Sequence, residues 1–418
     1  MVRAVRWLAL WLAVLGSAAQ AQRTGGTTAR AHEPNAAEQL GKPYVVLVAL
    51  NGFRPEYAKK YGATHLLTIA ARGASAPEGM IPAYPSQTFP NLYTIVTGLY
   101  PEHHGIVADA FYDPARKETW RGNDPKIAGD GSWYSGVPLW SLAEQHGMRS
   151  ACLLWPGCEA TIAGERPAYS AHDDTTSDAR RVEQVIAWLR LPGAERPHLI
   201  ALFFDNVEHA ASTYGPESPQ AAAAVRHADE LIGILERDLN ALHLPIDLIV
   251  VSDHGLARVE GEWIDVDSYA PLTGFTTAGP LLYAPSEAAA NAAYQKLKAA
   301  DARFMVYRRG NLPAHLHFSA NPRAGDPVIV ARGPYALAAT GMATQPAKGE
   351  AGFDPFLMPE MRGIFYAEGP DIRRGVTLRP FENVNVYPLI AKILGLKAPP
   401  DDGNVNVLSG ILMPTAAQ

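Results

Sequence analysis

Thr88 and the Asp253-His254 pair are the residues of this sequence whose types and placement could do chemistry. Asp253 and His254 are adjacent metal-capable side chains that directly follow an apolar run. Thr88 precedes an apolar stretch that begins at Phe89, where its hydroxyl could act as a nucleophile. Taken singly, both signals are weak, because an Asp-His pair in a loop is usually structural and a threonine at a helix start is usually a cap.

These residues belong to a set of four polar segments, each of which follows an apolar run. The segments are 51–54, 85–91, 205–212 and 252–255. In a sheet covered by helices, the working residues sit in loops at the carboxyl ends of the strands. We therefore expect the four segments to meet at one site.

Short apolar runs alternate with amphipathic stretches from residue 44 onward, which predicts an α/β fold whose sheet is covered on both faces by helices. The strands are expected at 44–50, 150–155, 199–204, 247–252 and 363–367. The helices are expected at 68–72, 89–97, 138–146, 177–189, 219–242 and 386–394. Residues 255–350 are richer in proline and glycine, and we expect a loop-rich cap insertion over one edge of the sheet.

The N-terminus has the pattern of an export signal. Arg3 and Arg6 precede a short apolar run, and an Ala-x-Ala sequence follows, which predicts a signal peptide over 1–21 that is cleaved after Ala21. The run is too short to span a bilayer, so we expect no membrane span after cleavage. Residues 22–42 are expected to be a flexible leader and 43–412 the folded domain of a periplasmic or secreted protein.

The composition narrows the class of partner. Of the 418 residues, 47% are hydrophobic and 19% charged, so a large core can form. A formal net charge of −6 argues against binding to a nucleic acid duplex. Cys152 and Cys158 could form a disulfide in an oxidising compartment or remain buried thiols, and the sequence leaves both readings open.

Six segments of the chain together resemble one family. They are 46–57, 80–114, 136–157, 199–216, 250–255 and 361–396, and the second includes PSQTFPNLYTIVTGLYPEHHGIVADAFYDP. The chain resembles the nucleotide pyrophosphatase/phosphodiesterase branch of the alkaline phosphatase superfamily. The resemblance implies an α/β/α sandwich with a central mixed, largely parallel sheet, and a two-zinc site at which a threonine attacks phosphorus.

On this resemblance, Thr88 matches the nucleophile, and Asp253 and His254 match two ligands of the metal that activates it. The third ligand of that metal, an aspartate in relatives, is Asn51 here. An amide oxygen can still bind a cation but carries no charge, so we expect this site to be weakened.

The second metal position departs further from the family pattern. Glu208 stands at an aspartate ligand, whereas Ser212 and Ala351 stand at two histidine ligands. Serine is a poor zinc ligand and alanine is none. We therefore expect at most one divalent metal and no full two-zinc site.

Other donors could substitute for the missing ligands. Asp205 and His209 repeat the four-residue ligand spacing, and they would replace Glu208 and Ser212 if the chain shifted by three residues. Five further histidines lie where relatives keep no ligand, and we expect them in surface or packing roles: His103, His104, His172, His315 and His317.

The phosphate-binding part of the predicted site is also changed. Asp109 replaces an asparagine whose amide donates to a phosphoryl oxygen in relatives, and a carboxylate there would repel that oxygen. Gln87 replaces a lysine that is common beside the nucleophile. Phe89 matches the aromatic residue that packs against a nucleotide base.

These departures predict an exported homologue with lost or strongly reduced hydrolysis, which binds a nucleotide or another small phosphate ester. The alternative is an active phosphate-ester hydrolase in which Thr88 works with a single or non-zinc metal. A purely structural or partner-binding role is a third interpretation, and the sequence identifies no protein partner.

Overall fold

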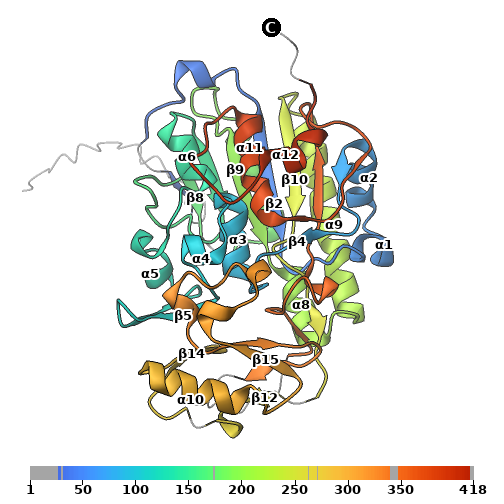
Figure 1. Cartoon of the computed structure of the whole chain (residues 1–418). Helices are drawn as coiled ribbons and strands as arrows, with labels where there is room; N and C mark the ends of the chain where they lie inside the picture. Colours follow the sequence, from blue (N-terminus) through green and yellow to red (C-terminus); the bar gives the residue numbers. More distant parts are fainter. Residues whose placement is uncertain are drawn as a thin grey trace, which may run out of the picture.

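A nine-stranded mixed sheet forms the centre of the computed structural model (Figure 1), which describes residues 27–29, 32–172, 175–261, 263–270, 272–338 and 347–414. The expected signal peptide lies outside the described residues. In order across the sheet, the strands are β1 (Thr27–Ala29), β8 (Tyr169–Ala171), β7 (Ser150–Leu153), β9 (Leu199–Phe204), β2 (Tyr44–Leu50), β10 (Ile246–Val251), β19 (Phe365–Glu368), β3 (Ala74–Ser75) and β20 (Val376–Thr377).

The five strands from β8 to β10 are parallel to one another, whereas β1 is antiparallel to β8, and β19 is antiparallel to β10 and β3. The predicted mixed, largely parallel sheet is therefore confirmed. The register aligns Leu50 of β2 with Phe204 of β9, and Ala49 with Val251 of β10. Because these three central strands end side by side, the segments that follow them start at one edge of the sheet.

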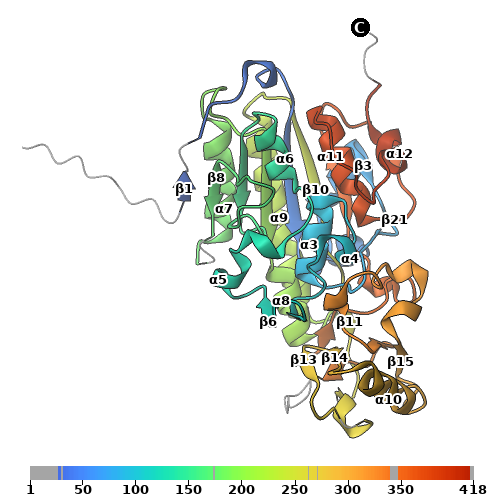
Figure 2. The ribbon, with the colours of Figure 1, turned by 60° about the vertical axis from the view of Figure 1, so that its left-hand side comes forward.

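Helices cover both faces of the sheet, as its continuous apolar strands require. One layer consists of α3 (Thr88–Thr97), α6 (Leu139–Gln145) and α11 (Val386–Leu394), and the other of α2 (Thr64–Arg72), α7 (Asp178–Leu189) and α9 (Pro219–Asn240). Alternate residues of β2 serve the two layers: Val45 and Leu47 join the first core, while Val46 and Val48 join the second. Figure 2 shows α9 and α11 on opposite sides of β2.

The cap has regular structure of its own. It contains β12 (Ile264–Asp265), β13 (Thr276–Ala278), β14 (Leu281–Tyr283), α10 (Glu287–Leu297), β15 (Phe304–Tyr307), β16 (Val328–Ala331) and β17 (Leu337–Ala338). A separate apolar cluster that includes Leu282, Leu297 and Phe304 holds it together. In Figure 1 the cap lies beyond the ends of β2 and β10, so it covers the carboxyl ends of these strands.

Shorter elements complete the chain. They are α1 (Tyr57–Tyr61), β4 (Met80–Ile81), α4 (Pro101–His104), β5 (Ala110–Asp113), β6 (Glu118–Arg121), α5 (Pro125–Ala128), α8 (Asn206–Tyr214), β11 (Ala257–Arg258), β18 (Gly349–Glu350), β21 (Phe381–Glu382) and α12 (Val405–Leu408). The prediction of a polar loop at 205–212 was wrong, because α8 occupies most of that segment.

The last part of the expected flexible leader packs against the domain. Asn35 is buried, and its amide donates to the carbonyl oxygens of Gly193, at 2.9 Å, and Arg196, at 2.8 Å. Buried polar groups of this kind hold a segment in place, because leaving them unpaired is costly. Residues 32–42 are therefore part of the folded structure.

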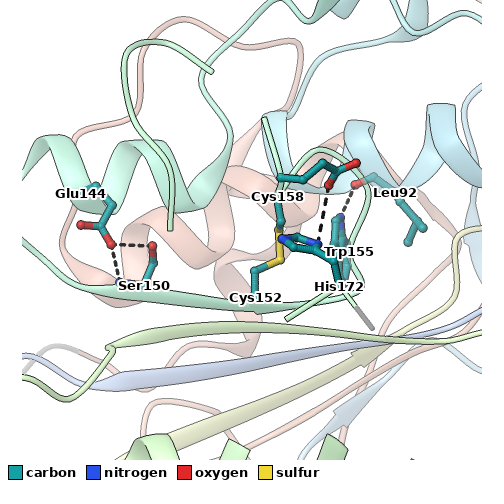
Figure 3. Close-up of a disulfide and its surroundings, with 8 residues drawn as sticks. Leu92, Glu144, Ser150, Cys152, Trp155, Cys158 and His172 are labelled. Carbon is teal, nitrogen blue, oxygen red and sulfur yellow. Dashed lines mark hydrogen bonds and ion pairs between the residues drawn. A yellow bond between two sulfur atoms is a disulfide. The ribbon is translucent and has the colours of Figure 1, made fainter. Parts of the chain in front are cut away.

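A disulfide joins Cys152, on β7, to Cys158 in the loop that follows (Figure 3). Both residues are buried, and so is Trp155 between them. The Trp155 indole donates a hydrogen bond of 3.1 Å to the carbonyl oxygen of Leu92, on α3. The crosslinked loop therefore supports the helix that begins at Thr88.

No helix among the described residues combines the length and the apolar character that crossing a bilayer requires.

Asp247, on β10, gives the fold a pH dependence that can be measured. Its side chain is fully buried beside Asp371, and burial raises its pKa to about 8, with the Asp371 carboxyl acting in the same direction. An unfolded aspartate loses its proton near pH ~4. Between these pH values the folded state binds more protons than the unfolded state, so the free energy of unfolding falls as pH rises through this window.

We expect Asp247→Asn to flatten this dependence. Relative to the wild type, the variant should gain stability between pH 5 and pH 8, by at most about 1.4 kcal/mol per pH unit. Urea unfolding at several pH values measures the effect, and Glu183→Gln, at an exposed position on α7, is the control. Parallel pH profiles for the wild type and Asp247→Asn would contradict the argument.

Candidate functional site

Three strand ends and one helix start build the site. Asn51 follows β2, Asp253 and His254 follow β10, and α8 follows β9. Thr88 is the first residue of α3. The structure thus brings the four polar segments together, as expected from their positions after strands.

The Thr88 hydroxyl lies between two of the predicted ligand residues. Its Oγ1 is 3.1 Å from Nε2 of His254 and 3.5 Å from Oδ1 of Asn51. The backbone holds Asn51 in place, because its N–H donates to Phe204 and its carbonyl oxygen accepts from the N–H of Glu208. The predicted nucleophile and two of the predicted metal-site residues, Asn51 and His254, therefore lie together.

The ring orientation of His254 makes its Nε2 an acceptor. Nδ1 is 2.8 Å from the carbonyl oxygen of Gly255, which can only accept, so Nδ1 carries the proton. In the neutral ring, Nε2 then presents its lone pair toward Thr88. His254 is almost completely buried, so this arrangement is shielded from bulk water.

Asp253 has one satisfied and one unsatisfied oxygen. Its Oδ1 accepts from the N–H groups of Gly52, at 3.2 Å, and His254, at 2.9 Å. Its Oδ2 is buried without a hydrogen-bond partner among the described residues and lies 3.5 Å from Nε2 of His254. Two electron-rich atoms that face each other in a buried place favour a proton or a cation near them. Burial raises the pKa of Asp253, and the His254 ring opposes the rise.

Glu208, on α8, reaches the same site. Gly52 allows this close approach, because a Cβ there would lie 2.9 Å from Cβ of Glu208, and its φ of +71° also favours glycine. Burial raises the pKa of Glu208, while His254 lowers it and Asp253 raises it further. The Glu208 carboxyl therefore lies close enough to Asp253 and His254 for their charges to act on it.

Glu350 is a site residue that the sequence reasoning missed. It lies on β18, and burial raises its pKa to about 7, with the Glu208 carboxylate adding to the rise. Glu350 directly precedes Ala351 in the sequence. An acidic side chain beside a predicted ligand position was the signal that could have identified it. The Glu208 and Glu350 carboxyl groups therefore lie near enough for the charge of one to act on the other.

The two positions predicted to have lost a metal ligand, Ser212 and Ala351, make other contacts. The Ser212 hydroxyl donates to the carbonyl oxygen of His209, on its own helix, at 3.3 Å. The N–H of Lys348 donates to the Ser212 carbonyl oxygen, which holds α8 beside the 348–351 segment. Ala351 presents a methyl group to a cavity under the cap.

The alternative pair Asp205 and His209 lies at the start of α8, and both residues are exposed. The five remaining histidines make other contacts. His104 is buried against Thr94, His103 contacts Asp402, His172 lies near Glu159, His315 contacts Asp354, and His317 stacks on Tyr100. Across the described part of the chain, no group of three or more His, Cys, Asp and Glu side chains is arranged to hold a metal ion.

Asp109 occupies the amino end of α3. Its Oδ1 accepts from the N–H of Phe89 at 2.8 Å, and its own N–H donates to Oε1 of Gln87 at 3.1 Å. Burial raises the pKa of Asp109 to about 6, although the Phe89 amide and His254 oppose the rise. A carboxylate of the protein itself thus sits at a helix start, where an anion would otherwise bind.

The Phe89 side chain packs against β6 and the residue that follows it. Its ring packs edge-on against Trp120, with the ring centres 5.5 Å apart. It also lies directly over Gly122, where a Cβ would come within 2.4 Å of the ring. The predicted base-stacking residue therefore lies on the β6 side of Thr88, with a partly exposed ring.

Known proteins share this sequence pattern. The family model for type I phosphodiesterase / nucleotide pyrophosphatase matches residues 45–354. An uncharacterised pyrophosphatase/phosphodiesterase of Schizosaccharomyces pombe is 33% identical over 387 residues, which cover 86% of this chain and 78% of that protein. Human ectonucleotide pyrophosphatase/phosphodiesterase family member 1 is 29% identical over 91% of this chain, which spans 43% of that longer protein.

A solved structure shares the fold. Murine ectonucleotide pyrophosphatase/phosphodiesterase 5, in an inactive threonine-to-alanine variant with AMP, superposes with a TM-score of 0.83. It is 26% identical, and the match covers 89% of this chain and 100% of that one. The predicted fold and the predicted family are both confirmed. With a family model that spans most of its sheet and its cap, this chain belongs to the type I phosphodiesterase/nucleotide pyrophosphatase family.

Proposed function

We propose that this chain is an exported family member that binds a nucleotide or another phosphate ester beside Thr88 and hydrolyses it slowly or not at all. The observation that carries the proposal is the second metal position. There, the Ser212 hydroxyl bonds to its own helix and Ala351 offers only a methyl group. Zinc sites need three or four nitrogen, sulfur or carboxylate donors. This position offers fewer donors, namely the carboxyl groups of Glu208 and Glu350.

The first metal position suits one divalent cation. Asp253, His254 and Asn51 would hold it, because the unpaired Oδ2 of Asp253 and Nε2 of His254 both face this place. A divalent cation bound there would lower the pKa of the Thr88 hydroxyl. Asn51 supplies no charge, so we expect weak binding of at most one metal per chain.

The chain's own residues can prepare Thr88 to a limited extent. The Nε2 lone pair of His254 lies within hydrogen-bonding distance of the Thr88 hydroxyl, so it can accept its proton. However, Asp109 already uses the Phe89 amide that could hold a phosphoryl oxygen. Its carboxylate also repels the charge that develops on the phosphoryl group, which lowers the rate of any transfer to Thr88.

A nucleotide is the ligand class that the comparisons favour. The murine relative with the same fold has a structure in complex with AMP. Phe89 provides a partly exposed ring next to Thr88, and stacking on a ring needs no metal. Binding can therefore persist where hydrolysis is impaired.

Export is supported by two features of the chain. The first is the signal pattern that ends at Ala21. The second is the disulfide between Cys152 and Cys158, since such bonds persist in oxidising compartments. Mass spectrometry of the protein from its native host should find a mature N-terminus at Gln22 and a crosslinked pair; an intact Met1 would contradict export.

The second candidate function is an active hydrolase with a single non-zinc metal. The carboxyl groups of Glu208 and Glu350 favour it, because hard cations such as Mg²⁺ and Mn²⁺ prefer oxygen ligands. Under this reading, turnover of a p-nitrophenyl nucleotide ester rises with added Mg²⁺ or Mn²⁺. Under the main proposal it stays low with every metal.

The main proposal predicts low metal content and low activity. Elemental analysis after incubation with zinc should find at most one zinc per chain, and hydrolysis of p-nitrophenyl thymidine 5′-monophosphate should be close to that of Thr88→Ala. Two bound zinc ions, with rapid turnover that Thr88→Ala abolishes, would overturn it.

Restoring the lost ligands should restore zinc binding. In a variant that combines Asn51→Asp, Ser212→His and Ala351→His, residues 208 and 212 present donors on one helix face. We expect a second zinc ion to bind and turnover to rise by about 100-fold. Substitutions near a metal ion change activity by up to about this factor. Replacing Ser212→His by Thr213→His, at the next and exposed position, is the matched control.

Asp109→Asn should strengthen the binding of AMP. The change removes a negative charge at the start of α3 and supplies an amide donor, so we expect a Kd about tenfold lower, or about 1.4 kcal/mol. Isothermal titration calorimetry measures it, and Glu118→Gln on β6 removes an equal charge from an exposed position. Equal effects of the two variants would show that only net charge matters.

A further inference from the structure

A cavity of about 230 Å³ lies between the segment that precedes Thr88 and the cap. The sheet domain contributes Tyr84, Ala351 and Phe353 to its wall, and the cap contributes Leu281, Ile329 and Leu337. These cap residues come from β14, β16 and β17, which Figure 1 places beyond the carboxyl end of the sheet. The cavity is therefore formed jointly by the two parts of the chain.

The wall of the cavity is mostly apolar. Among the described residues that line it, Glu350 is the only one with a charge-bearing side chain, and Gln87 is the only amide. Aromatic and aliphatic side chains form the rest, which disfavours a charged or strongly hydrated occupant. A cavity of about 150 Å³ with a comparable lining holds benzene, so this one has room for a substituted ring or a short hydrocarbon chain.

The position of the cavity connects it to the phosphate-binding place. Gln87 lines it and immediately precedes Thr88, and the Gly352 N–H beside Ala351 donates to the carbonyl oxygen of Ser86. Phe89 does not line it and instead packs toward Trp120 and Gly122. A phosphorus atom beside Thr88 would thus lie near the apolar cavity, whereas the Phe89 ring lies outside that cavity.

We propose that this cavity binds an uncharged aryl or short-alkyl group esterified to the phosphate, so that the favoured ligand is a phosphate ester with an apolar substituent. The inference rests on the proposed function for the phosphate but not for the cavity itself. Ala351 marks where the cavity has replaced a histidine ligand expected from the family pattern.

Fluorine NMR tests the cavity without the phosphate. In the wild-type protein, the signal of 4-fluorophenol should broaden saturably, and 4-fluorophenyl phosphate should bind at least about tenfold more tightly than inorganic phosphate, the gain expected from burying one ring. No saturable broadening of 4-fluorophenol in the wild type would overturn the inference.

Filling the cavity should abolish this binding. Ala331 lines it at the end of β16, and Ala331→Phe should weaken 4-fluorophenol binding by at least about tenfold. Ala331→Leu, which fills less space, should weaken it by an intermediate factor and serves if the larger change prevents folding. Ala292→Phe, at an exposed position on α10, should leave it unchanged. Equal effects of all three variants would contradict the assignment.

The two proposals can fail separately. Inorganic phosphate and AMP should bind Ala331→Phe as they bind the wild type, because Ala331 lies on the cap. If phosphate and AMP fail to bind any variant while 4-fluorophenol still binds the cavity, the proposed function is wrong and the cavity inference stands. If AMP binds and 4-fluorophenol does not, the cavity inference is wrong and the proposed function stands.

Discussion

The buried carboxylate of Asp253 is the constraint on which the site depends. Its Oδ1 joins the segment after β2 to the segment after β10, through the N–H groups of Gly52 and His254. This link fixes Asn51 and His254 at the positions from which both approach Thr88. The free Oδ2 then leaves a buried negative group that only a proton or a cation can balance.

Much of the sheet was predictable from the sequence, because β2 and β9 are apolar at every position and are bounded by polar residues. Both were predicted with the bounds that the structure shows. The helix α8 was not, because its sequence, NVEHAASTY, lacks a long apolar stripe and follows a strand directly. Tertiary contacts hold this helix in place. The Glu208 N–H donates to the Asn51 carbonyl oxygen, and the Lys348 N–H donates to the Ser212 carbonyl oxygen. Local patterns cannot report such contacts.

The candidate site was predictable as a set of segments but not as a geometry. Asn51, Thr88, Asp253 and His254 meet as expected, since each follows or starts a regular element. Glu350 was missed because it lies on a two-residue strand that carries no periodic signal, and it reaches Glu208 only through folding. The disulfide was left open for a similar reason: spacing permits a bond, but only the course of the chain after β7 decides whether the two sulfur atoms meet.

The charges of the site explain why its two sides differ. Asp109, Asp253, Glu208 and Glu350 bring four carboxyl groups into one region, and burial raises the pKa of each. With two zinc ions, such groups would be balanced and a phosphate dianion would be attracted. Each of these groups that is ionised opposes additional negative charge on a ligand, and a bound cation would offset that effect. Binding energy must then come from surfaces that need no charge, and this chain has two of them: the ring of Phe89 and the apolar wall under the cap. A loss of metal ligands on this scaffold would therefore shift recognition from the phosphate toward the groups attached to it.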